Sequence, residues 1–146
     1  MKVAGRWRYV YRAVDQYGQI IDALVSTQRD LRAARRFFAT ALRAHGDPVE
    51  VVTDRAPALR IAIEGLMPAA FHNTAQYANN RVECDHGRLK ARLRPMRGLK
   101  RDHSARVIIR GHGLMQNIRL GHYELGVDAR HHRRIERAFT ELARTI

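Results

Sequence analysis

The sequence contains a single cysteine, Cys84, so the chain cannot form an internal disulfide. No run of apolar residues approaches the length that is needed to cross a bilayer. The first residues, Met1–Arg8, lack the apolar core of a signal peptide. These absences argue against a disulfide-stabilised or membrane-anchored protein and predict a protein of a reducing cytoplasm.

Acidic residues are also scarce. The chain has 14 Asp and Glu against 27 Lys and Arg, which gives a formal net charge of +13 over 146 residues. Such a surplus favours a polyanionic partner, although a charged solubilising surface is the alternative. Most of the cations are arginines, whose planar forks suit phosphate groups. We therefore expect one nucleic-acid-binding domain, because the length allows a single core.

The N-terminal part of the sequence predicts a β-hairpin. Residues Trp7–Asp15 alternate with period two and are rich in strand-forming side chains. Asp15–Gly18 supplies turn residues, and Gln19–Ser26 predicts the second strand.

A helix and a buried strand are predicted next. Thr27 and Asp30 resemble a capping box, and apolar residues then recur at helical spacing until about Gly46. The β-branched segment Val49–Thr53 predicts a short buried strand. Asp54 is therefore expected at the carboxyl end of a strand.

The remainder of the chain is expected to contain one more strand and several helices. The predicted elements are a helix from Pro57 to about Leu66, a short strand over Ala70–Thr74, a helix from Asn79 or Asn80 to near Pro95, a basic loop over Arg97–Arg101, a helix capped by Ser104, and a final amphipathic helix carrying Ile135, Phe139 and Leu142. This order predicts an α/β domain with a mixed sheet.

Asp54 precedes the helix that begins at Pro57. Open α/β sheets present functional groups outside the carboxyl ends of their strands, so this position suits a metal ligand. An Asp here can equally cap a helix or shape a turn, and the residues alone leave both interpretations open.

Glu83 lies on a predicted helix, where residues three or four apart share one face. Gly87 removes side-chain bulk one turn beyond the carboxylate, which suits a site that admits a metal ion and a DNA backbone. The spacing alone favours instead a solvated face with an intrahelical ion pair. The residues that share this face with Glu83 are His86, Gly87, Lys90 and Arg94.

Asp54 and Glu83 together offer the oxygen ligands that Mg²⁺ prefers. Two such ions can activate a water or a DNA 3′-hydroxyl for phosphoryl transfer, and a third acid on a central strand usually completes the site. Cys84, His86 and His131 lack the spaced partners of a zinc site. The sequence also has no glycine-rich phosphate loop and no Ser or Cys nucleophile constellation.

Three blocks of the sequence resemble the DDE transposases of the insertion-sequence-six family, over nearly the whole chain. The blocks are Gly5–Trp7 followed by Tyr9 and Tyr11–Asp15, then Thr53–Ala58, and above all Asn79–Lys90, which is the most specific. The resemblance implies a ribonuclease-H-like domain of the retroviral-integrase type, with a mixed sheet flanked by helices. It also implies metal-dependent cleavage and transfer of DNA strands during transposition of an insertion sequence.

By that resemblance Asp54 and Glu83 match the second catalytic Asp and the catalytic Glu, and both bind the metal pair, Mg²⁺ or Mn²⁺. Arg88 and Lys90 match the rest of the signature, where a basic residue is expected to contact DNA. The implied partners are DNA, at element ends and target, and further copies of the chain in a synaptic complex at the bacterial nucleoid. Further DNA contacts are expected from Arg94, Arg97, Lys100 and Arg101.

The chain departs from the family at its N-terminal end. The family's first catalytic Asp precedes the segment that matches Lys2–Trp7, so we expect most of the opening strand, and a preceding helix-turn-helix, to be missing. Asp15 matches the end of the following strand and is no obvious substitute. Residues 1–125 are then expected to form a partial catalytic domain, impaired by itself, with residues 126–146 as a helix packed on it. The alternatives are a non-catalytic DNA-binding fragment that regulates full-length transposase, and a basic nucleic-acid packaging protein.

Overall fold

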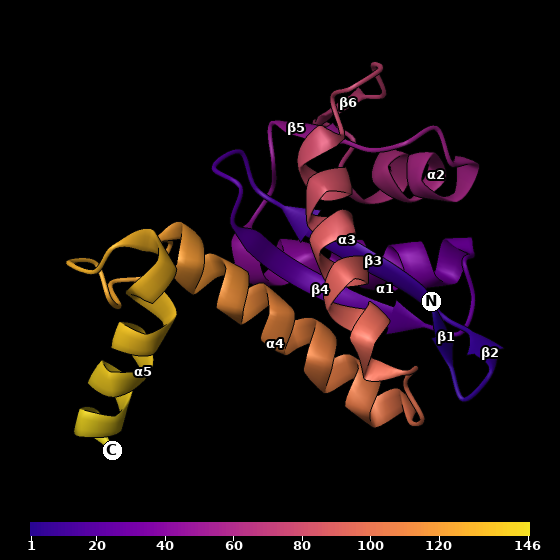
Figure 1. Ribbon diagram of the computed structural model, residues 1–146. Helices are drawn as coiled ribbons and strands as arrows, with labels where there is room; N and C mark the ends of the chain where they lie inside the picture. Colours follow the sequence, from indigo (N-terminus) through magenta and orange to yellow (C-terminus); the bar gives the residue numbers. More distant parts are fainter.

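The computed structural model describes all 146 residues, and a β-hairpin lies between two helical layers (Figure 1). Helix α1 (Leu31–His45), with α2 (Pro57–Leu66) packed beside it, covers one face of the hairpin. Helices α3 (Asn80–Leu93) and α4 (Asp102–Leu120) cover the other face. This α/β arrangement agrees with the prediction from the sequence.

The hairpin consists of β3 (Tyr9–Val14) and β4 (Ile20–Ser26), which pair in antiparallel register. One carboxylate oxygen of Asp15 accepts hydrogen bonds from the backbone N–H groups of Tyr17, at 2.8 Å, and Gln19, at 2.9 Å. These bonds fix the tight turn, as is common for Asp in this position. The predicted hairpin is therefore confirmed, with strands a little shorter than expected.

Alternation along the hairpin divides its side chains between the two layers. On one face, side chains pack against a cluster built by α1 and α2 around Phe37 and Ile63. On the other face, they pack against Leu89 of α3 and Ile109 of α4. The first set comprises Tyr11, Ala13 and Leu24, and the second comprises Val10, Ala23 and Val25.

Helix α1 begins one residue after Asp30, whose side chain accepts a hydrogen bond from the backbone N–H of Ala33 at 2.8 Å. The prediction of a capping box led by Thr27 is therefore wrong. Asp30 itself occupies the N-cap, because its short carboxylate reaches an N–H group that the first helical turn leaves free. The helix ends as predicted at Gly46, which adopts a φ of 77°.

Two further short pairs of strands accompany the hairpin. Strands β5 (Glu50–Val52) and β6 (Phe71–Asn73) pair in parallel, and β1 (Lys2–Val3) pairs with β2 (Arg6–Trp7). No backbone ladder joins β5 to the hairpin. Val51 instead packs against the α1 and α2 cluster, so the shared helical layer holds the two pairs together. The strands therefore include both parallel and antiparallel pairs, as a mixed sheet requires, but the backbone hydrogen bonds group them into three separate two-stranded sheets.

Helix α4 begins at Asp102, so the prediction that Ser104 caps it is wrong. Ser104 lies inside the first turn, as the third residue of the helix, so it cannot be the residue that precedes it. The side chain of Asp102 is bound by Arg8, with an Nε to Oδ1 distance of 2.7 Å. This bond ties the start of α4 to the residue before β3.

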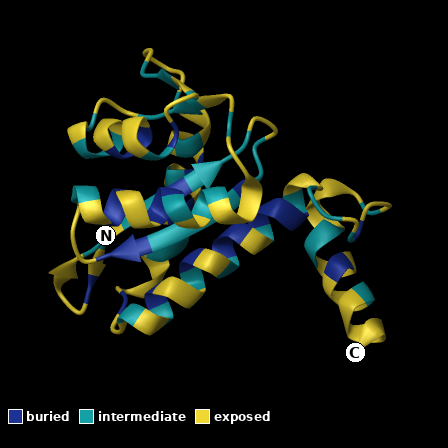
Figure 2. Ribbon diagram, turned by 180° about the vertical axis from the view of Figure 1, so that it is seen from behind, coloured by how far each residue is buried: buried dark blue, intermediate teal, exposed yellow.

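Helix α5 (Arg134–Thr145) projects from the end of α4 and is largely exposed (Figures 1 and 2). It is held by the bond from the Gly126 N–H to Glu141, at 2.9 Å, and by the bond from Arg134 to the Arg119 carbonyl, at 3.0 Å. No helix in the structure is both long enough and apolar enough to cross a membrane.

Candidate active site and nucleic-acid interface

Asp54 follows β5 by two residues and precedes α2, as the sequence predicts. One of its carboxylate oxygens accepts a hydrogen bond from the Ala56 N–H at 3.0 Å, which forms a turn before the helix. The other oxygen contacts Arg29 Nη2 at 3.0 Å, and both side chains are about half exposed, at 51% and 56%. An ion pair this exposed contributes only about 0–1 kcal/mol, so a second cation can displace the guanidinium.

Glu83 lies in the first turn of α3, on the exposed side of that helix. The intrahelical ion pair that its spacing favours does not form, and its carboxylate has no hydrogen-bond or ion-pair partner in the chain. Of the residues predicted to share a face with Glu83, Gly87, Lys90 and Arg94 are also exposed, whereas His86 is half-buried. The carboxylate is therefore free to bind a ligand from solvent.

The donor atoms of Asp54 and Glu83 suit a hard divalent cation. No three His, Cys, Asp or Glu side chains gather anywhere in the chain in a way that would hold a metal ion by themselves. Mg²⁺, however, usually binds to one or two carboxylates and completes its shell with waters and substrate phosphates. Each of the two carboxylates can serve as one ligand of that kind.

The basic residues predicted to bind DNA lie on α3 and on the segment that joins it to α4. All six side chains are exposed, and none takes part in an ion pair. The backbone of Arg97 is left-handed, with a φ of 50°, and the turn is anchored by buried Leu99, whose carbonyl accepts the Ala4 N–H at 2.7 Å. The surface is thus free to meet an anion. It comprises Arg88, Lys90, Arg94, Arg97, Lys100 and Arg101.

A family model described as a DDE domain matches residues 1–122. The chain is also 35% identical, over 97 residues, to the Staphylococcus aureus transposase for the insertion sequence-like element IS431mec, and equally to the transposase for the insertion sequence element IS257 in transposon Tn4003. The chain belongs to the DDE transposases of the insertion-sequence-six family. Each match covers 63% of this chain and 43% of the relative, so the matched stretch spans less than half of those transposases.

A solved structure supports the fold of this DDE domain. The structure is a cryoEM simian T-cell lymphotropic virus intasome in complex with PP2A regulatory subunit B56 gamma. The similarity has a TM-score of 0.57 at 20% sequence identity and covers 74% of this chain and 43% of that one. The ribonuclease-H-like, integrase-type fold implied by the sequence is therefore confirmed.

The DDE domain also contains a buried polar cluster that sequence reasoning missed. Asp85 of α3 forms an ion pair with Arg12 of β3 and accepts from His112 of α4 at 3.2 Å. The side chains of Arg12 and His112 are fully buried, and that of Asp85 is 5% exposed. One signal was available, because Asp85 and Leu89 are four residues apart and form the buried stripe opposite Glu83.

This cluster fixes the rotation of α3, and so the direction in which Glu83 points. Burial lowers the pKa of the Arg12 guanidinium, whereas the charge of Asp85 and their hydrogen bond raise it. Arg12 Nε and Nη1 find no other partner in the chain, so Asp85 is the only acid that compensates this buried charge. Burial, followed by the charge of Arg12, also lowers the pKa of His86, although the nearby charges of Glu83 and Asp85 oppose this shift.

Proposed function

We propose that this chain forms part of the catalytic domain of a DNA transposase, in which Asp54 and Glu83 bind divalent metal ions. The supporting observation is the free Glu83 carboxylate on the exposed side of α3, inside the segment that matches the DDE family. Asp54, at the carboxyl end of β5, supplies the second acid. A third acid, which the family resemblance places on an opening strand, completes the site.

Mg²⁺ or Mn²⁺, when bound, would activate a water or a 3′-hydroxyl and stabilise charge on the leaving oxygen of the DNA phosphate. The protein's own part is to present and orient the ligands. The Ala56 N–H holds one carboxylate oxygen of Asp54. Arg29 contacts the other oxygen, from which a bound metal ion would displace it. The Asp85 cluster orients the helix that carries Glu83.

We further propose that the six exposed basic residues of α3 and the following turn hold DNA phosphates beside these acids. Arg88 and Lys90 are within two turns of Glu83 on the same helix. The partners would be element ends and target DNA, held by several copies of the chain in a synaptic complex. Such a protein would act in the bacterial cytoplasm, in association with the nucleoid.

Reversing the charge of the turn tests this interface. In a plot of log K for duplex binding against log salt concentration, each phosphate contact contributes about 0.9 to the slope. The variant Arg97→Glu, Lys100→Glu, Arg101→Glu is therefore expected to reduce the magnitude of that slope by up to about three. A filter-binding titration against salt measures the slope. If the duplex affinity of the unchanged chain hardly depends on salt concentration, the result counts against DNA as the partner.

A strand-cleavage assay tests the catalytic proposal. The substrate is duplex DNA that carries the element's ends, with Mg²⁺ or Mn²⁺, and the proteins compared are the 146-residue chain and a version extended upstream to include an opening strand with an Asp. We expect cleavage and strand transfer only from the extended protein, since two carboxylates cannot fix both metal ions. Cleavage by the 146-residue chain that depends on Glu83 would show that another residue, Asp15 being the nearest candidate, supplies the third ligand.

The same assay separates the second candidate function, a non-catalytic DNA-binding fragment that regulates full-length transposase. The net charge of +13 and the exposed basic surface favour it independently of any catalysis. In that case the extended protein cleaves the DNA, while the 146-residue chain binds the DNA and inhibits cleavage by the extended protein.

A further inference from the structure

A groove runs along the outer edge of β4, on the side that faces away from β3. It has a volume of about 290 Å³, and the stretch Ala23–Val25 of β4 forms its floor together with Ile109. Strand β4 pairs only with β3, so this edge has no neighbouring strand. The peptide groups along an open edge offer hydrogen bonds that the sheet itself does not use.

Three arginines from both helical layers line this groove. Arg36 comes from α1, on one face of the hairpin, while Arg106 and Arg110 come from α4, on the other. All three are exposed, none forms an ion pair, and no acidic residue lines the groove. Three like charges that converge on one groove repel each other, and a bound anion would relieve that repulsion.

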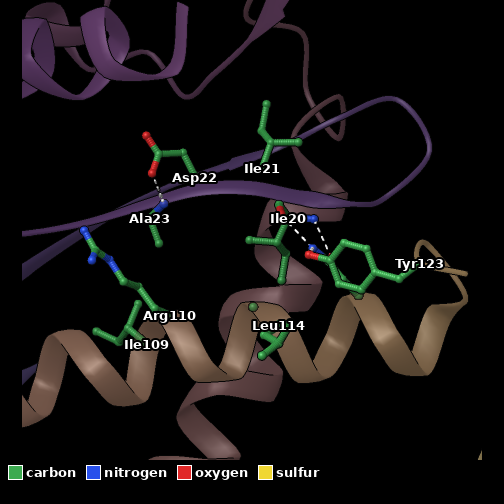
Figure 3. Close-up of a pocket in the computed structure, with 10 residues that line it drawn as sticks. Ile20, Ile21, Asp22, Ala23, Ile109, Arg110, Leu114 and Tyr123 are labelled. Atoms are coloured by element: carbon green, nitrogen blue, oxygen red, sulfur yellow. Dashed lines mark hydrogen bonds between the residues drawn. The ribbon is translucent and has the colours of Figure 1, made fainter. Parts of the chain in front are cut away.

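A second groove, of about 200 Å³, continues from the first and shares Ala23, Ile109 and Arg110 with it. Figure 3 shows Arg110 extending from α4 toward β4 beside Ala23. Asp22 lines this second groove but turns its carboxylate to the Ala23 N–H, at 2.7 Å, and forms no ion pair with Arg110.

The edge of β4 is closed at its beginning. The side chain of Asn117 accepts from the Ile20 N–H and donates to the Ile20 carbonyl, both at 2.8 Å. These two bonds occupy the positions that a neighbouring strand would use. The arginine-lined part, over Ala23–Val25, is left as the segment of this edge that can meet a ligand.

We propose that this groove binds phosphodiester groups of a DNA strand, in addition to the basic surface of α3 and its turn. Guanidinium forks match phosphate oxygens in a bidentate manner, and single phosphate groups suit a groove of this size. A DNA backbone passing the sheet edge would place its phosphates between α1 and α4. The inference rests on the proposed function only in taking DNA as the ligand.

The test compares two triple variants that remove the same charge. The groove variant carries Arg36→Gln, Arg106→Gln and Arg110→Gln, and its matched control changes three exposed arginines of α1 that do not line the groove. Duplex binding is measured without metal over a range of salt concentrations, with circular dichroism and thermal unfolding as checks on the fold. The control variant carries Arg32→Gln, Arg35→Gln and Arg43→Gln.

The groove variant is expected to bind at least about tenfold more weakly and to lose about two to three from its salt slope, against less than about one for the control. Equal effects of the two triples would overturn the proposal, as would an unchanged chain that fails to bind duplex at low salt. If the arginines only shield the sheet edge, the groove variant will self-associate and bind DNA like the control, which also overturns it.

A second measurement does not depend on the variants folding. Dimethyl phosphate is titrated into the unchanged chain while the arginine Nε–H resonances are followed by NMR. Larger shifts are expected for Arg36, Arg106 and Arg110 than for the control arginines, and uniform shifts would overturn the proposal. Because no metal or cleavage is involved, a failed catalytic proposal leaves this result intact, and charge reversal at Arg97–Arg101 reports separately on the α3 surface.

Discussion

Replacing Glu83 by Gln is expected to lower metal-dependent strand cleavage by about a thousandfold or more in the protein extended upstream. Gln keeps the size of the side chain and removes the charge that would bind the metal. A metal ion supplies several kcal/mol of transition-state stabilisation, and each 1.4 kcal/mol or so corresponds to tenfold in rate. The measurement is the single-turnover cleavage rate on a duplex with the element's ends.

Glu136→Gln is the matched control, because Glu136 is an exposed residue of α5 and makes no ion pair. Its rate should stay within about twofold of the unchanged protein, as surface substitutions away from special features have small effects. DNA binding by Glu83→Gln should be kept or slightly improved, since an acid has been removed from a basic surface. Unchanged cleavage by Glu83→Gln would show that this residue is not a metal ligand.

Replacing Asp85 by Ala is expected to lower the free energy of unfolding by about 3–5 kcal/mol. The change leaves the guanidinium of Arg12, fully buried, without its acid and leaves His112 without its acceptor. Removing one partner of a buried ion pair costs far more than the pair contributes, because the other charge stays out of water. Urea unfolding followed by circular dichroism measures the loss, which is a large share of the stability of a small domain.

The double variant Asp85→Leu, Arg12→Met serves as its control. Replacing both charges by apolar groups of similar volume is often neutral or stabilising, so most of the loss should be recovered. A loss below about 1 kcal/mol for Asp85→Ala would mean that water reaches Arg12 when its partner is removed, and that the cluster does not fix α3.

The local elements of this fold are largely written in the sequence. The alternation over Trp7–Asp15, followed by turn residues and the strand-forming stretch Gln19–Ser26, was sufficient to predict the hairpin, because the side-chain period of a strand is fixed by its backbone. Pro57 correctly marked the start of α2. The cap assignments at Thr27 and Ser104 were wrong, because several polar residues near a helix start can accept the free N–H groups.

The candidate site was predictable only in part. The resemblance to the family identified Asp54 and Glu83, and spacing placed Glu83 on a common face with Gly87 and Lys90. Spacing alone also favoured an intrahelical ion pair for Glu83 that the structure does not contain. Whether a long side chain reaches its helical neighbour depends on rotamers and solvent, and the sequence does not specify these.

The sequence by itself determined the local elements, the positive charge and the family, since each depends on residues close together or on composition. Only the tertiary structure brought Arg12, Asp85 and His112 into one buried cluster and set Arg36 of α1 beside the arginines of α4. Contacts of this kind join residues far apart in the chain, as does the bond between Ile20 and Asn117, which are 97 residues apart. They form because apolar faces on either side of the hairpin pack together, and that packing decides which polar groups are carried inward with them and which remain at the edge.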